Sequence, residues 1–320
     1  MLRNYFLLIL IIPLLPGFSW GFFAHQNINK LAVFTLPPGM IRFYKNNIQY
    51  ITEHAVDPDK RRYADTAEAP RHYIDTDRYG ISPFDSLPKK WKEASEKYSE
   101  KVLYENGIVP WQIERTYYSL IKAFRERDSL GILKLSADLG HYVSDAHVPL
   151  HTTENYNGQL TGQVGIHGFW ESRLPELFHE EYDFLVGPAV YLNNPLDEAW
   201  KIVMGAQSNK DSVLLIEARL SRTFPSDRKF TYSERNGRVE KQYSEEYSRA
   251  FHIALNGMVE KQMRSSILKT AGFWYSAWVD AGQPNLKGLH KKAISSEETA
   301  SLDKVKKLYE QGKILGREEN

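Results

Sequence analysis

Residues 141–171 read HYVSDAHVPLHTTENYNGQLTGQVGIHGFWE, and the pattern within this segment decides how the rest of the sequence is interpreted. It contains two pairs of possible metal ligands with four-residue spacing, His141 with Asp145 and His167 with Glu171. On a helix, side chains at positions i and i+4 lie on one face, a single turn apart. Each pair can therefore bind one metal ion if both segments are helical.

A third histidine lies between the two pairs. His151 follows Pro149, which favours the end of the first helix, so the loop can deliver this imidazole to the same place. Imidazole and carboxylate ligands without thiolate are typical of zinc at a hydrolytic site. Any one of these histidines taken alone is more often a surface or hydrogen-bonded core residue, but their joint spacing favours a metal cluster.

The first residues have the pattern of a secretory signal peptide. Arg3 precedes the apolar run from Tyr5 to Leu15, and small residues follow up to Ser19, where cleavage is expected. The run is short for a membrane span, which leaves an uncleaved anchor as the alternative. We therefore expect residues 1–19 to be removed and the mature protein to be periplasmic or secreted.

Cleavage after Ser19 would give the chain a chemically useful new end. The mature protein would begin with Trp20, whose free α-amine and carbonyl oxygen can chelate a metal, and His25 follows one turn later. The amino terminus would then be part of the metal site.

Composition excludes several classes of protein. The 320 residues are 42% hydrophobic and 13% aromatic, enough for a sizeable core, and contain no cysteine, so no disulfide supports the fold. The net charge of +1 gives no sign of the basic surface of a duplex-binding protein. Recognition of a substrate must then be local, and we infer no protein partner and expect a monomer.

Apolar residues recur with helical spacing along most of the chain, which predicts an all-α fold. We expect one multi-helix domain over residues 20–284 and a charged C-terminal extension over 285–320. An Asn236-Gly237 pair predicts a small hairpin or a projecting loop within 230–239. The expected helices cover residues 27–34, 40–54, 89–101, from 110, 130–146, 167–178, 195–222 with a break near Gly205, 244–279 and 297–311.

Taken in order, nine residues closely resemble a known family pattern: Trp20, His25, Asp57, His72, His141, Asp145, His151, His167 and Glu171. The pattern resembles the superfamily that unites bacterial zinc-dependent phospholipase C with the single-strand-specific zinc nucleases of fungi and plants. This resemblance implies an all-helical fold with a trinuclear zinc cleft and hydrolysis of phosphate esters.

The resemblance also implies how three zinc ions are divided among these residues. One ion is assigned to Asp57, His72, His141 and Asp145. A second is assigned to His151, His167 and Glu171. The third is assigned to the Trp20 amine and carbonyl, His25 and the far oxygen of Asp145.

Two acidic neighbours, Asp59 and Asp65, are alternatives to Asp57, and we choose Asp57 because its fifteen-residue distance to His72 fits the nuclease-like pattern best. Asp57 could also orient or deprotonate the attacking water. The resemblance further suggests that Lys60 neutralises a phosphate oxygen, with an ordinary solvated lysine as the alternative.

Tyr73 and Asp75 are candidate substrate-binding residues. In a nuclease-like site they could stack on a base and hydrogen-bond its edge. The alternative is a buried tyrosine and a loop aspartate.

Three functions remain open. The amino-terminal Trp-Gly-x3-His and the His-x-x-Trp-Glu segment look more like those of the nucleases, so we expect a nuclease or nucleotidase that acts on single-stranded nucleic acid or nucleotides. Glu171 and the short step from His151 to His167 favour a phospholipase C that acts on phospholipid. An inactive secreted zinc-binding module is the third possibility.

Overall fold

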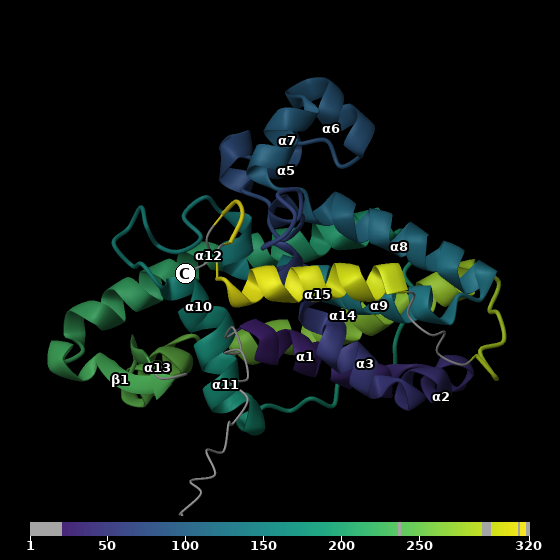
Figure 1. Cartoon of the computed structure of the whole chain (residues 1–320). Helices are drawn as coiled ribbons and strands as arrows, with labels where there is room; N and C mark the ends of the chain where they lie inside the picture. Colours follow the sequence, from purple (N-terminus) through teal and green to yellow (C-terminus); the bar gives the residue numbers. More distant parts are fainter. Residues whose placement is uncertain (1–20, 236–237, 290–295, 313, 318–320) are drawn as a thin grey trace, which may run out of the picture.

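The computed structural model describes residues 21–235, 238–289, 296–312 and 314–317. Within these ranges the chain is mostly helical, which confirms the all-α class, and its described strands form a single antiparallel pair (Figure 1). The predicted signal peptide, residues 1–19, and Trp20 lie outside the described residues. No helix in the described ranges is both long and apolar enough to span a membrane.

The α-helices before the metal-ligand segment are α1 Gly21–Ala32, α2 Pro38–Asn46, α3 Ile48–Glu53, α4 Asp57–Arg61, α5 Pro83–Ser86, α6 Trp91–Tyr98, α7 Glu100–Asn106 and α8 Val109–Glu126. Those that follow are α9 Ser129–Ala146, α10 Ile166–Gly168, α11 Leu174–Phe178, α12 Pro195–Thr223, α13 Glu245–Ala254, α14 Met258–Asp280 and α15 Ser296–Glu310. A π-helical turn, η6, covers Phe169–Arg173. The 3₁₀ turns are η1 Val33–Thr35, η2 His54–Val56, η3 Ala69–Arg71, η4 Thr76–Tyr79, η5 Pro149–Thr152, η7 His179–Glu181 and η8 Ser226–Arg228.

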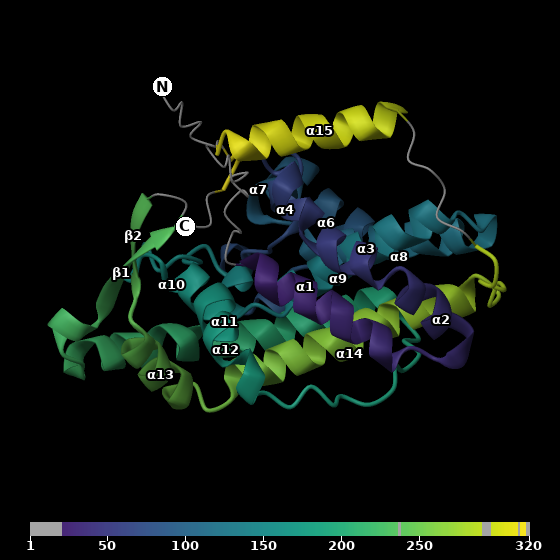
Figure 2. The same cartoon turned by 60° about the horizontal axis from the view of Figure 1, so that its bottom comes forward.

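Helix α9 lies at the centre of the bundle, in contact with α1, α8, α12 and α14 (Figures 1 and 2). Its residues from Ser136 to Ala146 are all buried, because neighbouring helices cover every face. On one side, the buried indole of Trp274 donates a hydrogen bond to the Ser136 carbonyl at 2.9 Å. The central position of α9 places both His141 and Asp145 inside the protein, away from bulk water.

Gly140 allows α1 to approach α9 closely. A Cβ atom at this position would lie 1.9 Å from Asn29 Oδ1 on α1 and 2.9 Å from Thr270 Cγ2 on α14. Only glycine can occupy such a position without moving a neighbouring helix. The close approach brings His25 of α1 against His141 of α9, with their ring centroids 4.0 Å apart.

Several helix boundaries differ from those predicted. The expected helix 244–279 is two helices, because Gly257, with a φ of 75°, precedes α14 in a left-handed conformation. The expected helix 40–54 is also divided, at Asn47. In contrast, α12 continues through Gly205 without the expected break, so tertiary packing outweighs the low helix propensity of one glycine.

The predicted hairpin is present as β1 Phe230–Arg235 and β2 Arg238–Tyr243, with Phe230 opposite Tyr243. Its Asn236-Gly237 turn lies outside the described residues. Tyr243 stacks on Phe169 of η6 with ring centroids 3.9 Å apart. The hairpin is thus attached to the turn that carries Glu171.

The C-terminal helix expected at 297–311 is confirmed by α15, which lies along the outside of the bundle (Figure 2). Tyr309 on α15 packs on Phe22 of α1 with ring centroids 5.9 Å apart. The domain limits at residues 20, 284 and 285 stay a prediction.

Candidate metal centre

Eight side chains capable of binding metal come together from separate elements of the fold. They are His25 of α1, Asp59 of α4, His72 just after η3, His141 and Asp145 of α9, His151 of η5, His167 of α10 and Glu171 of η6. Their ligand atoms form three groups, and within each group all atoms lie within 4.8 Å of one another. The groups are Asp59 with His72 and His141, His25 with His141 and Asp145, and His151 with His167 and Glu171.

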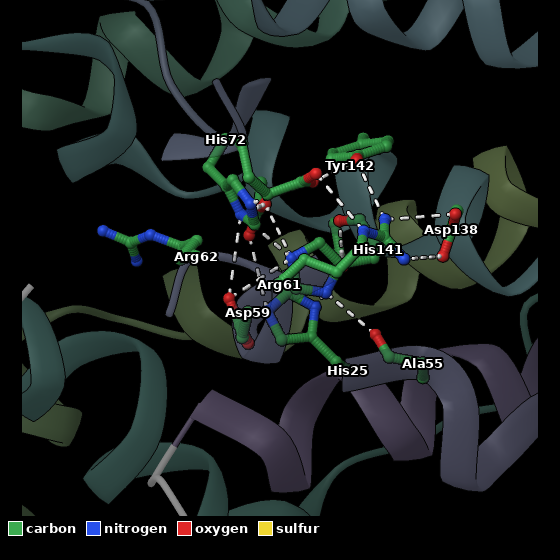
Figure 3. Close-up of polar contacts among 12 residues, drawn as sticks. His25, Ala55, Asp59, Arg61, Arg62, His72, Asp138, His141 and Tyr142 are labelled. Atoms are coloured by element: carbon green, nitrogen blue, oxygen red, sulfur yellow. Dashed lines mark hydrogen bonds and ion pairs between the residues drawn. The ribbon is translucent and has the colours of Figure 1, made fainter. Parts of the chain in front are cut away.

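The first group surrounds Oδ2 of Asp145. This oxygen lies 2.9 Å from His72 Nδ1 and 3.1 Å from His141 Nε2. Asp59 Oδ1 completes the arrangement at 3.7 Å from His72 Nδ1 and 3.5 Å from His141 Nε2 (Figure 3). Two imidazoles and two carboxylates therefore face one small volume, which is a donor set that suits zinc.

The two oxygens of Asp145 face different sets of histidines. While Oδ2 faces the first group, Oδ1 lies 3.4 Å from His25 Nε2 and 3.8 Å from His151 Nδ1. A single carboxylate thus lies between adjacent ligand groups. This is the arrangement that a bridging ligand requires.

The group of His151, His167 and Glu171 is the tightest of the three. The Nε2 atoms of the two histidines are 2.8 Å apart, and Glu171 Oε2 lies 3.2 Å from one and 3.1 Å from the other. Glu171 is on the π-helical turn η6, directly after α10, which carries His167. Single π turns inside helices are often found at functional sites, where the extra residue in the turn redirects a side chain.

The amino end of α1 reaches the same centre. His25 Nδ1 forms a hydrogen bond with Ser144 Oγ at 2.6 Å. A Cβ atom on Gly21 would lie 3.1 Å from Glu171 Oε1. The first described residue of the chain is therefore adjacent to a carboxylate of the metal centre.

Backbone carbonyls fix the orientation of two of the imidazoles. His141 Nδ1 donates to the Ala55 carbonyl, and His151 Nδ1 donates to the His72 carbonyl, each at 2.8 Å. Each bond keeps a proton on Nδ1, so that Nε2 is the atom directed into the centre and becomes the ligand once it carries no proton. This is the usual outer-shell support of a histidine that binds metal.

A buried carboxylate, Glu68, supports His72 from the opposite side. Its Oε1 atom lies 3.6 Å from His72 Nε2, and it accepts hydrogen bonds from Tyr142, Arg61 and Arg71. Burial acts to raise the pKa of Glu68, but the nearby imidazole of His72 and the charges of Arg61 and Arg71 outweigh burial and lower this pKa. Glu68 is therefore an anion inside the protein, and no motif in the sequence indicates its position.

The carboxylates of the centre are also held in their ionised form. Burial acts to raise the pKa of Asp59, but the nearby charge of His141 outweighs it and lowers this pKa to about 2. The same histidine holds the pKa of Asp145 well below its usual range, again against the effect of burial. Ionised carboxylates and Nε2 lone pairs are the forms that bind metal.

Asp59 takes the place that the sequence prediction gave to Asp57. The Asp57 carboxylate lies 2.5 Å from His54 Nδ1 and 3.2 Å from Lys60 Nζ, and it belongs to none of the three groups. The two aspartates are two positions apart on α4, so their side chains leave the helix in different directions. Lys60, the other predicted catalytic residue, pairs with Asp57 and lies 5.9 Å from the Phe22 ring.

The predicted substrate-binding residues lie next to the first group, with a partner that sequence analysis missed. Tyr73 is mostly buried, and Asp75 forms an ion pair with Arg317, whose Nη1 lies 2.7 Å from Asp75 Oδ1. Burial raises the pKa of Asp75 to about 6 despite the opposing charge of Arg317. A contact across 242 residues of sequence has no local signal that could have revealed it.

The surroundings of one oxygen atom show whether these residues fit a metal ion. Glu171 Oε2 is buried and has no hydrogen-bond partner within the described part of the chain, yet it faces the Nε2 atoms of two histidines. A buried carboxylate oxygen that accepts no hydrogen bond lowers the stability of the folded protein unless a cation contacts it. The residues present therefore fit a metal ion. The identity and number of such ions are part of the proposed function.

A comparison with models of known protein families and with curated proteins found no match to this chain.

Proposed function

We propose that this protein is a zinc-dependent hydrolase of phosphate esters, of the phospholipase C and zinc-nuclease type, acting on single-stranded nucleic acid or nucleotides. The observation that carries the proposal is the presence of three adjacent groups of possible ligands, two of which face the two oxygens of Asp145. In such a centre, zinc ions lower the pKa of bound water and stabilise negative charge on a phosphoryl group.

The protein's own residues have separate roles in this proposal. Asp59, His72, His141 and Asp145 hold one ion, and His151, His167 and Glu171 hold a second. His25 and the far oxygen of Asp145 contribute to a third, together with the amine and carbonyl of Trp20. Glu68 and the backbone carbonyls of Ala55 and His72 orient the imidazoles and keep their Nε2 or Nδ1 atoms directed at the centre.

The location of Gly21 supports the role of the amino terminus. Gly21, the first described residue, lies against Glu171, since a Cβ atom on it would be 3.1 Å from Glu171 Oε1. Removal of residues 1–19 and export of the mature protein are part of the same proposal, since only a free α-amine can bind a metal.

Tyr73 and Tyr156 place two aromatic rings beside the candidate metal centre. Tyr73 follows the ligand His72, and the Tyr156 ring lies edge-on to the ligand His167 with centroids 6.0 Å apart. Aromatic side chains beside a phosphate-cleaving centre provide stacking surfaces for unpaired bases. The quaternary ammonium of a choline headgroup also binds to aromatic faces, so the substrate assay compares both classes of substrate.

One experiment tests this function. The purified mature chain is stripped with a chelator, reloaded with zinc, and offered single-stranded DNA, RNA, a 3'-nucleotide and phosphatidylcholine. We expect hydrolysis of the nucleic acids or the nucleotide, and its loss on chelation. Hydrolysis of phosphatidylcholine alone would assign the phospholipase function, and hydrolysis of none would leave a zinc-binding module without activity.

A pair of variants shows whether the activity belongs to this centre. Asp145→Asn should lower turnover by about 100-fold or more, because a ligand shared by two groups is removed. Asp280→Asn is the matched control, since Asp280 at the end of α14 accepts hydrogen bonds from Tyr117 and Tyr191 and lies outside all three groups. Equal activity of the two variants would contradict the proposed centre.

A further inference from the structure

The C-terminal segment packs on the side of the molecule that carries α4 and the metal centre. Tyr309 on α15 stacks on Phe22 and lies edge-on to Tyr63, with centroids 5.9 and 5.0 Å apart. Farther along, the Leu315 amide donates to the carbonyl of Arg62 at 3.0 Å. Residues 314–317, which we term the strap, therefore follow the surface toward the ligand groups.

Arg62 forms hydrogen bonds with the strap through its main chain and its side chain. Its side chain is 1% exposed, and its guanidinium donates a hydrogen bond to the carbonyl oxygen of Arg317. Arg62 lies three residues after the ligand Asp59, and Figure 3 shows its guanidinium directed away from Arg61 and Asp138. The main chain of the strap therefore forms two hydrogen bonds with Arg62, and these hold it beside the first ligand group.

Arg317 places a flat cation between two aromatic rings. Its guanidinium carbon lies 4.0 Å from the centroid of Tyr73 and 3.6 Å from that of Tyr156. The same group donates to Asp75 Oδ1 at 2.7 Å and to the Thr153 carbonyl at 3.0 Å. Its planar faces contact rings and its edge contacts acceptors, which is how a nucleobase would use such a slot.

Each tyrosine of the slot adjoins one ligand group of the centre. Tyr73 directly follows His72 in the first group, and Tyr156 contacts the ring of His167 in the tightest group. A ligand held between the two tyrosines would therefore have its attached phosphate close to both. The strap occupies this position in the structure described here.

We propose that the strap is an internal competitor, in which Arg317 fills the slot between Tyr73 and Tyr156 and must be displaced by a planar ring of the substrate. The proposal rests on the proposed function for the identity of that substrate, but the slot and its occupant can be tested without turnover. Because Arg317 occupies only the slot, it weakens the binding of ligands that place a ring there. The binding of a phosphate without a ring is unaffected.

The test is a binding experiment with adenosine, which carries a flat ring and no phosphate ester to hydrolyse. Adenosine and ribose 5-phosphate are titrated calorimetrically into the zinc-loaded full chain and into Arg317→Ala. We expect Arg317→Ala to bind adenosine about tenfold more tightly, because an ion pair and two cation–π contacts no longer compete. Binding of ribose 5-phosphate should change by less than about twofold.

Arg249→Ala is the matched control. Arg249 also contacts a ring, that of Phe178 at 4.0 Å, and a carboxylate, that of Glu181 at 2.6 Å, but away from the slot. It should bind adenosine as the unsubstituted chain does. Equal or weaker adenosine binding by Arg317→Ala, or no adenosine binding by either protein, would overturn the proposal. Absence of phosphate-ester hydrolysis would overturn only the proposed function.

A second readout follows the strap itself. Saturating adenosine should increase the rate at which trypsin cuts α15 at Lys304, Lys306 and Lys307, because displacement of the strap loosens the helix before it. Tyr309→Ala, which removes the contacts with Phe22 and Tyr63, should shift adenosine binding in the same direction as Arg317→Ala. A cleavage rate that is unchanged by saturating adenosine would show that the ring does not displace the strap.

Discussion

Asp59 Oδ1 lies 3.5 Å from Nε2 of His141, although the two residues belong to different helices that are far apart in the sequence. Asp57, only two residues earlier on α4, directs its carboxylate to His54 and Lys60. Residues two apart on a helix point in different directions, so the two aspartates cannot face the same centre. The choice between them has a measurable consequence.

Asp59→Asn should lower the zinc content of the purified chain by about one ion, because it removes a carboxylate from the first ligand group. Asp57→Asn should keep the full content, since the Asp57 carboxylate belongs only to a partly exposed ion-pair cluster. Metal analysis of the two proteins after dialysis decides the matter. A loss on Asp57→Asn alone would restore the original prediction.

The amino terminus provides a second prediction. A chain with one residue added before Trp20 has an amide nitrogen in place of the α-amine, so it should bind about one zinc fewer and turn over about 100-fold more slowly. Correctly processed Trp20→Ala should lose much less, because the proposed ligands are backbone atoms. Full zinc content and full activity in the extended chain would exclude the amino-terminal ligand.

Gly140→Ala should destabilise the protein by about 1–3 kcal/mol, because its Cβ would overlap Asn29 and force α1 away from α9. Gly205→Ala is the matched control, since it lies within α12 and its Cβ would meet no atom within 4 Å. This second change should be neutral or raise the free energy of unfolding by about 0.5–1 kcal/mol. Urea denaturation measures both, and equal destabilisation would argue against a special role of the close approach.

A buried carboxylate gives a stability prediction that depends on pH. Glu217 accepts hydrogen bonds from Lys229 at 2.9 Å and Tyr247 at 2.7 Å, which join α12 to the base of the hairpin and to α13. Burial acts to raise the pKa of Glu217, but its hydrogen bonds, first that of Lys229, outweigh burial and lower this pKa. The ionised form is therefore stabilised by folding. Its contribution is present above the ordinary value of 4.5 and is lost as the pH falls through the folded pKa.

Glu217→Gln should accordingly cost about 2 kcal/mol at pH 7 and progressively less below pH 4.5. Glu246→Gln provides the comparison, because Glu246 pairs with Arg228 on the surface, where salt bridges contribute about 1 kcal/mol or less. Thermal unfolding from pH 3 to 7 measures both. A cost for Glu217→Gln that is independent of pH would contradict the role of its charge.

The sequence by itself predicted two pairs of side chains that come together and the class of fold that presents them. The four-residue spacings of His141 with Asp145 and of His167 with Glu171 act through helix geometry alone, and both pairs come together as expected. The apolar periodicity likewise predicted an all-helical chain, because burial of one helix face is a local property of the sequence.

Only the tertiary structure decided the contacts between distant segments. The direction in which α4 enters the bundle decides that Asp59, rather than Asp57, faces His141. The place where α15 packs decides that Arg317 lies against Tyr73. Glu68 was missed for the same reason, since nothing near it in the sequence shows that it would be buried among Tyr142 and two arginines. Such contacts arise from how helix faces fit together, and that fit depends on all the packed side chains at once rather than on any local pattern.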